Sequence, residues 1–332
     1  MSVNLKLINA DNLRHNISLF KDKKVCLMVK ANAYGHGLKE VVEICDDLVD
    51  AYGVVSEEEG AELRKLTKNR VIIFSVARDF LFCKSEKLEF MIENEEMLWQ
   101  AIEYGCKNLL HLAINSGMNR FGTKSGIVLK NIDQILKEKK INLKSIYTHF
   151  SQVENERVTN KQFQNFLKLR NYISEDAPIC LGGSGASYFS ADMIRLGIAG
   201  YGYGNECEFV MQIRSQIIKT LYVKKGEFVG YGKKFRAKSP CFIGIVPIGY
   251  GDGLLRNLSQ KFYVKINGKK FRAVGNICMD SFFVKIDESV HVGDEVEVMF
   301  DASYLAKKAK TIPYEILTNF SKLRGEVKII RN

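Results

Sequence analysis

The stretch VCLMVKANAYGHG occupies residues 25–37 and is the best guide to the fold and chemistry of the first half of the chain. Five apolar residues precede Lys30, and Tyr34 and a histidine between two glycines follow it. Such an apolar run is typical of a buried β-strand, and the glycines let the backbone approach a small ligand closely. A lysine that ends a buried strand loses its charge readily, which makes Lys30 a candidate nucleophile toward a carbonyl group. The alternative is a lysine whose side chain simply reaches solvent.

Seven further β-rich runs, separated by helical patterns, follow within the first 200 residues. They occupy residues 51–55, 71–76, 88–93, 108–114, 143–150, 177–182 and 192–200. Ser56 with Glu59 predicts a capping box, and Asn94 predicts a second helix N-cap. Nearly continuous apolar strands that alternate with helices indicate a parallel sheet buried on both faces. Eight such units predict a (β/α)₈ barrel with its chemistry at the carboxyl ends of the strands. An open doubly wound sheet is the alternative, but the dinucleotide-binding glycine fingerprint is missing after the first strand.

The composition of the chain changes after about residue 206. Strand-like runs at 209–223, 242–251, 262–286 and 294–300 are joined by Gly, Asn and Asp turns. Asn267-Gly268 is a strong hairpin signal, and one helix is expected at about 314–320. We therefore expect a barrel over residues 1–206 and a mostly β domain over residues 207–332.

Composition excludes several classes of protein. The 332 residues carry a net charge of +11, but the lysines are spread along the chain and no nucleic-acid-binding motif is present. Eight cysteines and five histidines are scattered, so neither a disulfide framework nor a metal site is expected. The N-terminus lacks the apolar core of a signal peptide, and no apolar run is long enough for a membrane span. The sequence predicts a cytoplasmic protein without nucleic-acid or membrane partners.

The stretch VKANAYGHG resembles the pyridoxal-phosphate-binding signature of the alanine racemase family. Seven further blocks match this family in the same order along nearly the whole chain. They are NSGMNRFG (115–122), YTHF (147–150), RLGIAGYG (195–202), GYG (230–232), PIGYGDG (247–253), ICMD (277–280) and IPYE (312–315). One match of this kind is weak, whereas eight collinear matches are highly specific. The resemblance implies a (β/α)₈ barrel followed by a β domain and pyridoxal 5'-phosphate as cofactor.

The resemblance implies two catalytic bases. Lys30 forms the internal aldimine with the cofactor and acts on one face of the substrate Cα, and Tyr231 acts on the other face. Racemisation needs both, because a proton removed from one side must be returned to the other. By the same resemblance Arg195 contacts the pyridine nitrogen, and His149 connects Arg195 to Tyr231. An arginine cannot give up its proton, so the ring nitrogen stays neutral and transamination is disfavoured.

The remaining site residues are also implied by the resemblance. The cofactor phosphate is held by Tyr34, Ser184, Tyr314 and the backbone N–H groups of Gly197 and Ile198. The stretch GGSGAS departs from the family pattern here, so Ser187 is an alternative to Ser184. Arg120 and the backbone N–H of Met279 bind the substrate carboxylate, and Tyr250 and Asp280 line the entry.

The function implied is the interconversion of L-alanine and D-alanine, which supplies D-alanine for cell-wall peptidoglycan. Because Tyr231 and Met279 lie in the β domain, and family members complete each barrel site with the partner's β domain, a homodimer with shared sites is implied. The alternatives are a racemase of another small or basic amino acid, a barrel-type decarboxylase, and a cofactor carrier without catalytic activity. Decarboxylases of this fold usually place a carboxylate at the pyridine nitrogen, and Arg195 opposes that alternative.

One position departs from the family pattern. Many members carry a carbamate-modified lysine seven residues before the arginine that corresponds to Arg120, and here that position is Ala113. The carbamate orients the arginine, so another group must do so in this chain. Asn115, a water molecule or a bound anion are the alternatives.

Overall fold

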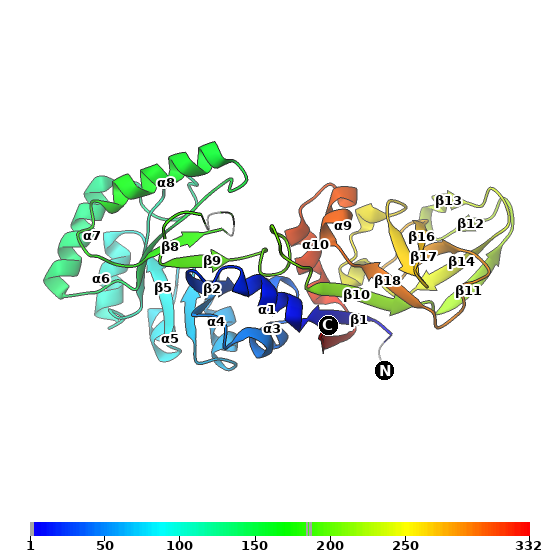
Figure 1. The fold of residues 1–332 in the computed structure, drawn as a ribbon, viewed down its shortest axis with the longest axis horizontal. Helices are drawn as coiled ribbons and strands as arrows, with labels where there is room; N and C mark the ends of the chain where they lie inside the picture. The colour runs from blue at the N-terminus through cyan, green and yellow to red at the C-terminus, as the bar shows by residue number, and fades with distance from the viewer. Residues whose placement is uncertain (1–2, 184, 186–187) are drawn as a thin grey trace. The chain divides into compact units, whose positions relative to one another are not determined.

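The structure is a computed structural model that describes residues 3–183, 185 and 188–332. The chain forms two compact units (Figure 1). One contains Arg14–Lys30 and Val42–Cys207, and the other contains Met1–Leu13, Ala31–Val41 and Glu208–Asn332. The boundary near residue 207 lies where the composition changes. The observed division differs from the expected one in that two N-terminal segments group with the β-rich part of the chain.

The first unit is built around a closed parallel barrel, which confirms the fold expected from the sequence. Its strands are β2 (Lys24–Met28), β3 (Ala51–Val54), β4 (Arg70–Ile73), β5 (Leu88–Ile92), β6 (Leu110–Ala113), β7 (Ser145–His149), β8 (Ile179–Gly182) and β9 (Met193–Leu196). Closure joins β2 to β9, with Cys26 opposite Arg195. Almost every strand residue is buried, as expected for a sheet covered on the outside by helices and packed on the inside.

Helices surround the barrel (Figure 1). They are α1 (Ala10–Ser18), α3 (Leu38–Cys45), α4 (Glu57–Arg64), α5 (Phe80–Ser85), α6 (Glu95–Glu103), α7 (Gly126–Lys139) and α8 (Glu156–Arg170). Asn94 caps α6 as expected, accepting from the Met97 N–H. Ser56 caps α4, but the Glu59 carboxylate accepts from the Val55 N–H at 3.0 Å. The capping box is therefore completed one residue earlier than predicted.

A polar layer lies at the amino ends of strands β4 to β7. Glu89 accepts from Arg70 and from His111 Nε2, each at 2.8 Å, and His111 Nδ1 lies 2.7 Å from Ser145 Oγ. Burial alone would raise the pKa of the Glu89 carboxyl, but the hydrogen bonds from His111 and Arg70 outweigh it and lower the pKa to about 2. Burial lowers the pKa of His111. Contacts at this end of a (β/α)₈ barrel stabilise the fold and leave the opposite end for chemistry.

The second unit contains a nine-stranded sheet in the order β11-β14-β17-β16-β15-β18-β10-β1-β19. The bounds are β1 (Leu5–Asn9), β10 (Met211–Gln216), β11 (Lys219–Val223), β14 (Cys241–Val246), β15 (Tyr263–Ile266), β16 (Lys269–Val274), β17 (Phe282–Ile286), β18 (Glu295–Met299) and β19 (Glu326–Ile330). A separate pair, β12 (Phe228–Val229) and β13 (Phe235–Arg236), carries the loop that contains Tyr231. Strand β1 is antiparallel to β10 and parallel to β19. It is not apparent from the sequence, because it is short and has a lysine at its second position.

The expected hairpin joins β15 to β16, and its turn residues Asn267 and Gly268 have φ angles of 50° and 76°. Two helices follow the sheet strands, α9 (Ala302–Ala309) and α10 (Pro313–Asn319). The sequence predicts α10 to within one residue at each end, whereas α9 is not anticipated. Among the helices formed by the described residues, none has the length and apolar character needed to cross a membrane.

Candidate active site

Lys30 lies two residues beyond Met28, the carboxyl end of β2, where the barrel fold places chemistry. Its amine is half-buried, and burial, with smaller contributions from Arg120 and Arg195, lowers its pKa below 10.5. A lysine whose pKa is lowered in this way is more often neutral at physiological pH, and a neutral amine is the form that attacks a carbonyl carbon. The structure therefore gives Lys30 the environment that a covalent site needs.

The four residues after Lys30 form a left-handed helical turn, labelled within α2 (Lys30–Tyr34). Residues 31–34 all have φ of 52° or 53°, a conformation that costs about 1–2 kcal/mol for each residue with a side chain. Hydrogen bonds from the Gly35 N–H to the Ala31 carbonyl (3.0 Å) and from the Gly37 N–H to the Asn32 carbonyl (3.1 Å) close the turn. Backbone strain of this kind persists only where surrounding contacts hold it, and it concentrates at functional sites.

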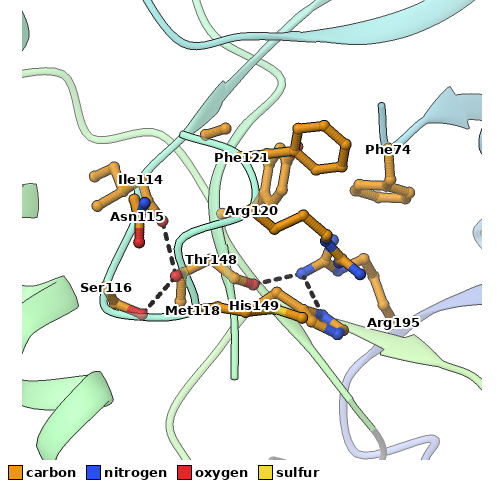
Figure 2. Close-up of a pocket in the computed structure, with 12 residues that line it drawn as sticks. Phe74, Ile114, Asn115, Ser116, Met118, Arg120, Phe121, Thr148, His149 and Arg195 are labelled. Carbon is orange, nitrogen blue, oxygen red and sulfur yellow. Dashed lines mark hydrogen bonds between the residues drawn. The ribbon is translucent and has the colours of Figure 1, made fainter. Parts of the chain in front are cut away.

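Arg195 and His149 meet at the carboxyl ends of β9 and β7 (Figure 2). Arg195 Nη2 donates to the Thr148 carbonyl and lies 3.3 Å from His149 Nδ1. Arginine has no acceptor, so His149 Nδ1 must be the unprotonated nitrogen and Nε2 carries the hydrogen. Burial, followed by the charges of Arg195, Arg120 and Lys30, lowers the pKa of His149 to about 2, so the imidazole is neutral.

Two aromatic rings hold the Arg195 guanidinium in place. Its Cζ lies 4.5 Å from the ring centroid of Phe74 and 4.7 Å from that of Tyr147. Arg195 Nε is buried and has no hydrogen-bond partner within residues 3–183, 185 and 188–332. A buried N–H donor without an acceptor lowers the free energy of unfolding. The unpaired Nε–H therefore indicates a place for an acceptor atom of a ligand.

Gly182, the last residue of β8, makes room for this pair. A Cβ at this position would collide with Arg195 Nη2 and His149 Nδ1. Residue 182 is paired with Arg195 on β9 and with His149 on β7. The side chains of Arg195 and His149 therefore meet over a position where only glycine fits.

A pocket in the barrel unit contains Arg195, His149 and Arg120 (Figure 2). Its lining comprises Phe74, Ala113, Ile114, Asn115, Ser116, Met118, Arg120, Phe121, Tyr147, Thr148, His149 and Arg195. Arg120 extends from the loop after β6 toward Arg195. Two guanidinium groups at one pocket favour an anionic ligand such as a carboxylate.

The other predicted residues of the barrel unit lie after β8 and β9. Gly197 and Ile198 begin a tight turn in which their carbonyls accept from the N–H groups of Gly200 and Tyr201, both at 3.0 Å. Such turns direct backbone N–H groups toward a common point and suit phosphate. Ser184 and Ser187 both lie outside the described residues.

The second unit contains the remaining predicted residues. Tyr34 and Tyr314 have ring centroids 5.9 Å apart, with Tyr314 in the first turn of α10. Tyr231 begins the short 3₁₀ helix between β12 and β13 and is 73% exposed in the single chain. Its carbonyl accepts from Asn276 Nδ2 at 2.9 Å, which fixes the backbone of the GYG loop. The catalytic role that the resemblance implies for Tyr231 would require another surface to cover this exposed side chain.

The loops that carry Tyr250 and Met279 are joined by hydrogen bonds. The Tyr250 N–H donates to the Cys278 carbonyl at 3.0 Å, and the Gly251 N–H donates to the Met279 carbonyl at 2.9 Å. Arg324 holds both loops, since it donates to the buried Asp252 at 2.8 and 2.9 Å and to Asp280 at 2.8 Å. The structure thus brings Tyr250, Met279 and Asp280 together, as the sequence predicts.

Models of one family match most of the chain. The "Alanine racemase, N-terminal domain" model matches residues 8–205, and the "Alanine racemase, C-terminal domain" model matches residues 210–327. An alanine racemase of Francisella philomiragia is 30% identical over 357 residues, which cover 96% of this chain and 98% of the relative. This chain belongs to the alanine racemase family.

Solved alanine racemases have the same fold. The E. faecalis enzyme is 26% identical with a TM-score of 0.93, covering 99% of this chain and 98% of its own. The Clostridium difficile 630 enzyme in complex with cycloserine is 27% identical with a TM-score of 0.89, covering 100% and 96%. The Bartonella henselae enzyme, described with covalently bound pyridoxal phosphate, is 23% identical with a TM-score of 0.89 and complete coverage of both chains. The resemblance stated from the sequence motifs is confirmed.

The position that departs from the alanine racemase pattern is Ala113, which is buried beside the Arg120 loop. Asn115 Oδ1 accepts from the N–H groups of Gly117 and Asn119, both at 3.1 Å. Asn115 therefore orders the loop that leads to Arg120. The Gly122 N–H donates to the Glu93 carboxylate at 2.5 Å and fixes the other end of the same loop.

Several site residues are not identified by the sequence analysis. Gly182 ends a predicted strand, and Asp252 lies inside the PIGYGDG block. The sequence predicts no functional role for either residue. Arg324 has no local signal, because its function depends on two acidic residues more than 40 positions away. Long-range ion pairs of this kind become visible only in the folded chain.

Proposed function

We propose that this chain interconverts L-alanine and D-alanine with pyridoxal phosphate as cofactor, and that Lys30 and Tyr231 are the catalytic residues. Membership of the alanine racemase family makes the chain an isomerase. The observation that carries the residue assignment is the buried Arg195 Nε without an acceptor, at the same barrel end as Lys30. A pyridine nitrogen is an acceptor without a hydrogen, and it would satisfy that donor.

The residues present fit the cofactor at both of its ends. Lys30 would attach to its aldehyde carbon, and Arg195 would donate to its ring nitrogen. Tyr34, Tyr314, the N–H groups of Gly197 and Ile198, and Ser184 or Ser187 would hold its phosphate. When bound, pyridoxal phosphate withdraws electrons from the substrate Cα and so makes the α-hydrogen acidic.

The side chains of this chain would then move the proton. Lys30 accepts or returns it on one face of Cα, and Tyr231 does so on the opposite face. His149 supports this division, because its Nδ1 accepts from Arg195 and its Nε2–H is left to donate toward the phenol oxygen. A positioned acid–base group commonly contributes roughly 10²–10⁴-fold to a rate.

Arg120 would bind the substrate carboxylate together with the Met279 N–H. The pocket that contains Arg120 is also bordered by Arg195 and His149, so a carboxylate there lies in a positive field. A guanidinium recognises a carboxylate with two parallel hydrogen bonds, which orients Cα as well as holding it.

The active form in this proposal is a homodimer that shares its sites. Tyr231, Met279 and Asp280 all belong to the β-rich unit, and Tyr231 and Met279 are 73% and 55% exposed in the single chain. A partner's barrel would cover them. The cytoplasmic location and the supply of D-alanine for peptidoglycan stay predictions from the resemblance.

The proposed reaction is tested with purified protein, pyridoxal phosphate and each L-amino acid, followed by chromatographic analysis of product chirality. We expect D-alanine to form from L-alanine, with other amino acids converted far more slowly. Faster racemisation of serine or of a basic amino acid would show that the substrate assignment is wrong.

A further inference from the structure

Lys6 is a buried charged residue that the proposed reaction does not use. It lies on β1 and is only 3% exposed, and its Nζ donates to the Gly35 carbonyl at 2.7 Å. Lysine is among the residues that are almost never buried without a partner. Its position on a strand packed between β10 and β19 therefore calls for a specific role.

The partner of Lys6 is the residue that ends the left-handed turn. Gly35 has φ of 82°, and its N–H closes the turn on the Ala31 carbonyl. A Cβ on Gly35 would collide with the Leu317 carbonyl, so α10 packs against the same peptide. The Gly35 peptide is thus held by β1, by α10 and by the turn itself.

The carbonyl groups of Ala33, Tyr34 and Gly35 lie at the end of this turn, and each is within hydrogen-bond distance of a buried side chain. His36 Nδ1 lies 3.0 Å from the Ala33 carbonyl and 3.1 Å from the Tyr34 carbonyl, and Lys6 Nζ meets the Gly35 carbonyl. Carbonyls at the end of any helical turn lack partners inside the turn. His36 and Lys6 together supply these partners where water is absent.

This arrangement is costly for folding. Burial lowers the pKa of Lys6 to about 8, with Glu40 opposing the shift. The folded-state pKa lies below the unfolded value, so the charged amine destabilises the folded state at pH 7. An apolar side chain of similar length would avoid that cost but would lose the hydrogen bond to the Gly35 carbonyl. A buried group that lowers stability without taking part in the reaction points to a constraint on local geometry.

We infer that Lys6 is a positioning residue for the cofactor phosphate: its hydrogen bond to the Gly35 carbonyl fixes the left-handed turn and thereby the Tyr34 hydroxyl. The inference rests on the proposed function, because Tyr34 is a proposed phosphate ligand. Lys30 precedes the turn, whereas Tyr34 is its last residue and lies next to the Gly35 peptide. Loss of the Lys6 contact should therefore affect the phosphate end of the cofactor site most.

The test compares pyridoxal phosphate with pyridoxal, which lacks the phosphate. Dissociation constants of both are measured on cofactor-free wild type, Lys6→Met, Lys6→Gln and Lys328→Met. Lys328 is a lysine on the adjacent strand β19 whose side chain is 45% exposed, and it serves as the matched control. For Lys6→Met we expect a roughly 5–10-fold weaker affinity for pyridoxal phosphate, the effect of one lost hydrogen bond from a charged donor, and little change for pyridoxal.

Several results would overturn the inference. They are an unchanged affinity ratio in folded Lys6→Met, an equal loss for both compounds, or the same loss in Lys328→Met. If Lys6→Met does not fold, the affinities for pyridoxal phosphate and pyridoxal are compared in Lys6→Gln instead. An unchanged ratio of the two affinities in that variant would refute the positioning role of Lys6. Wild type and Lys30→Ala are measured in parallel. If wild type itself does not attach pyridoxal phosphate at Lys30, the proposed function fails instead.

Discussion

Arg195 and His149, which are 46 residues apart in sequence, lie 3.3 Å from each other at Nη2 and Nδ1. The contact decides the histidine tautomer, because only the Nδ1 lone pair can accept from a guanidinium. Strands β7 and β9 flank β8 in the barrel, so the two side chains meet above the last residue of β8. That residue is Gly182, and its missing side chain is what allows the contact.

Gly182→Ala should therefore impair the site strongly. The new methyl group collides with both Arg195 and His149, and we expect a loss of about 1–3 kcal/mol in the free energy of unfolding. Weaker cofactor binding should accompany it. Urea denaturation and cofactor titration measure the two effects. Gly204→Ala is the control, since the atoms nearest to a Cβ there are Ala199 Cβ and Cys207 Sγ, at 3.0 and 3.2 Å, and neither belongs to the proposed site. Equal effects of the two substitutions would contradict the prediction.

Lys30 should carry the cofactor covalently. Its lowered pKa favours the neutral amine that attacks an aldehyde. Borohydride reduction of the protein with pyridoxal phosphate, followed by peptide mass mapping, should place the label on Lys30. Lys30→Ala, treated in the same way, should lose the specific label. A label on any other lysine of the wild type would show that the assignment is wrong.

Tyr231 should act on L-alanine and Lys30 on D-alanine. In Tyr231→Phe the cofactor should still bind, and Lys30 should still exchange the α-hydrogen of D-alanine. In deuterated water this variant should incorporate deuterium into D-alanine faster than it forms L-alanine, whereas L-alanine should exchange poorly. Racemisation should fall roughly 10²–10⁴-fold. Equal deuterium incorporation from both enantiomers would refute Tyr231 as the second base.

Mixed dimers should regain activity if the sites are shared. Lys30→Ala and Tyr231→Phe subunits should each have little or no racemase activity, but a hybrid dimer would contain one site with neither substitution. Mixing them should restore part of the racemase activity, and each variant incubated alone provides the baseline. Subunit exchange without any recovered activity would show that Lys30 and Tyr231 of one site come from the same chain.

Glu89 should make the fold sensitive to acid. Its folded-state pKa of about 2 lies below the unfolded value of 4.5, so its stabilising contribution is present above pH 4.5 and is lost as the pH falls toward 2. Glu89→Gln should lower the free energy of unfolding at pH 7 by about 1.5–3 kcal/mol, since it removes the charged acceptor of Arg70 and His111, and should flatten its decline in acid. Urea unfolding at several pH values measures both effects. The exposed Glu43→Gln is the control, and an unchanged pH dependence in Glu89→Gln would contradict the prediction.

Much of the fold follows from local sequence pattern. The eight barrel strands are buried on both faces, so each appears as a continuous apolar run that a single sequence displays. The Asn267-Gly268 turn and the Asn94 cap are local in the same sense, because one or two residues determine them. Strand β1 has no such signal. It is defined by pairing with β10 and β19, the latter more than 300 residues away.

The site divides in the same way. The sequence by itself placed Lys30 at the end of a buried strand, and motif resemblance named Arg195, His149 and Tyr231. Only the tertiary structure decided that Lys30 is followed by a left-handed turn. Ala and Tyr disfavour positive φ, and one Asn, which tolerates it, does not specify four such residues in a row. That conformation depends on the neighbouring His36 and also on Lys6 and Leu317, which reach the turn from distant parts of the sequence. Strain needs contacts distant in sequence to hold it, and a sequence pattern does not show those contacts.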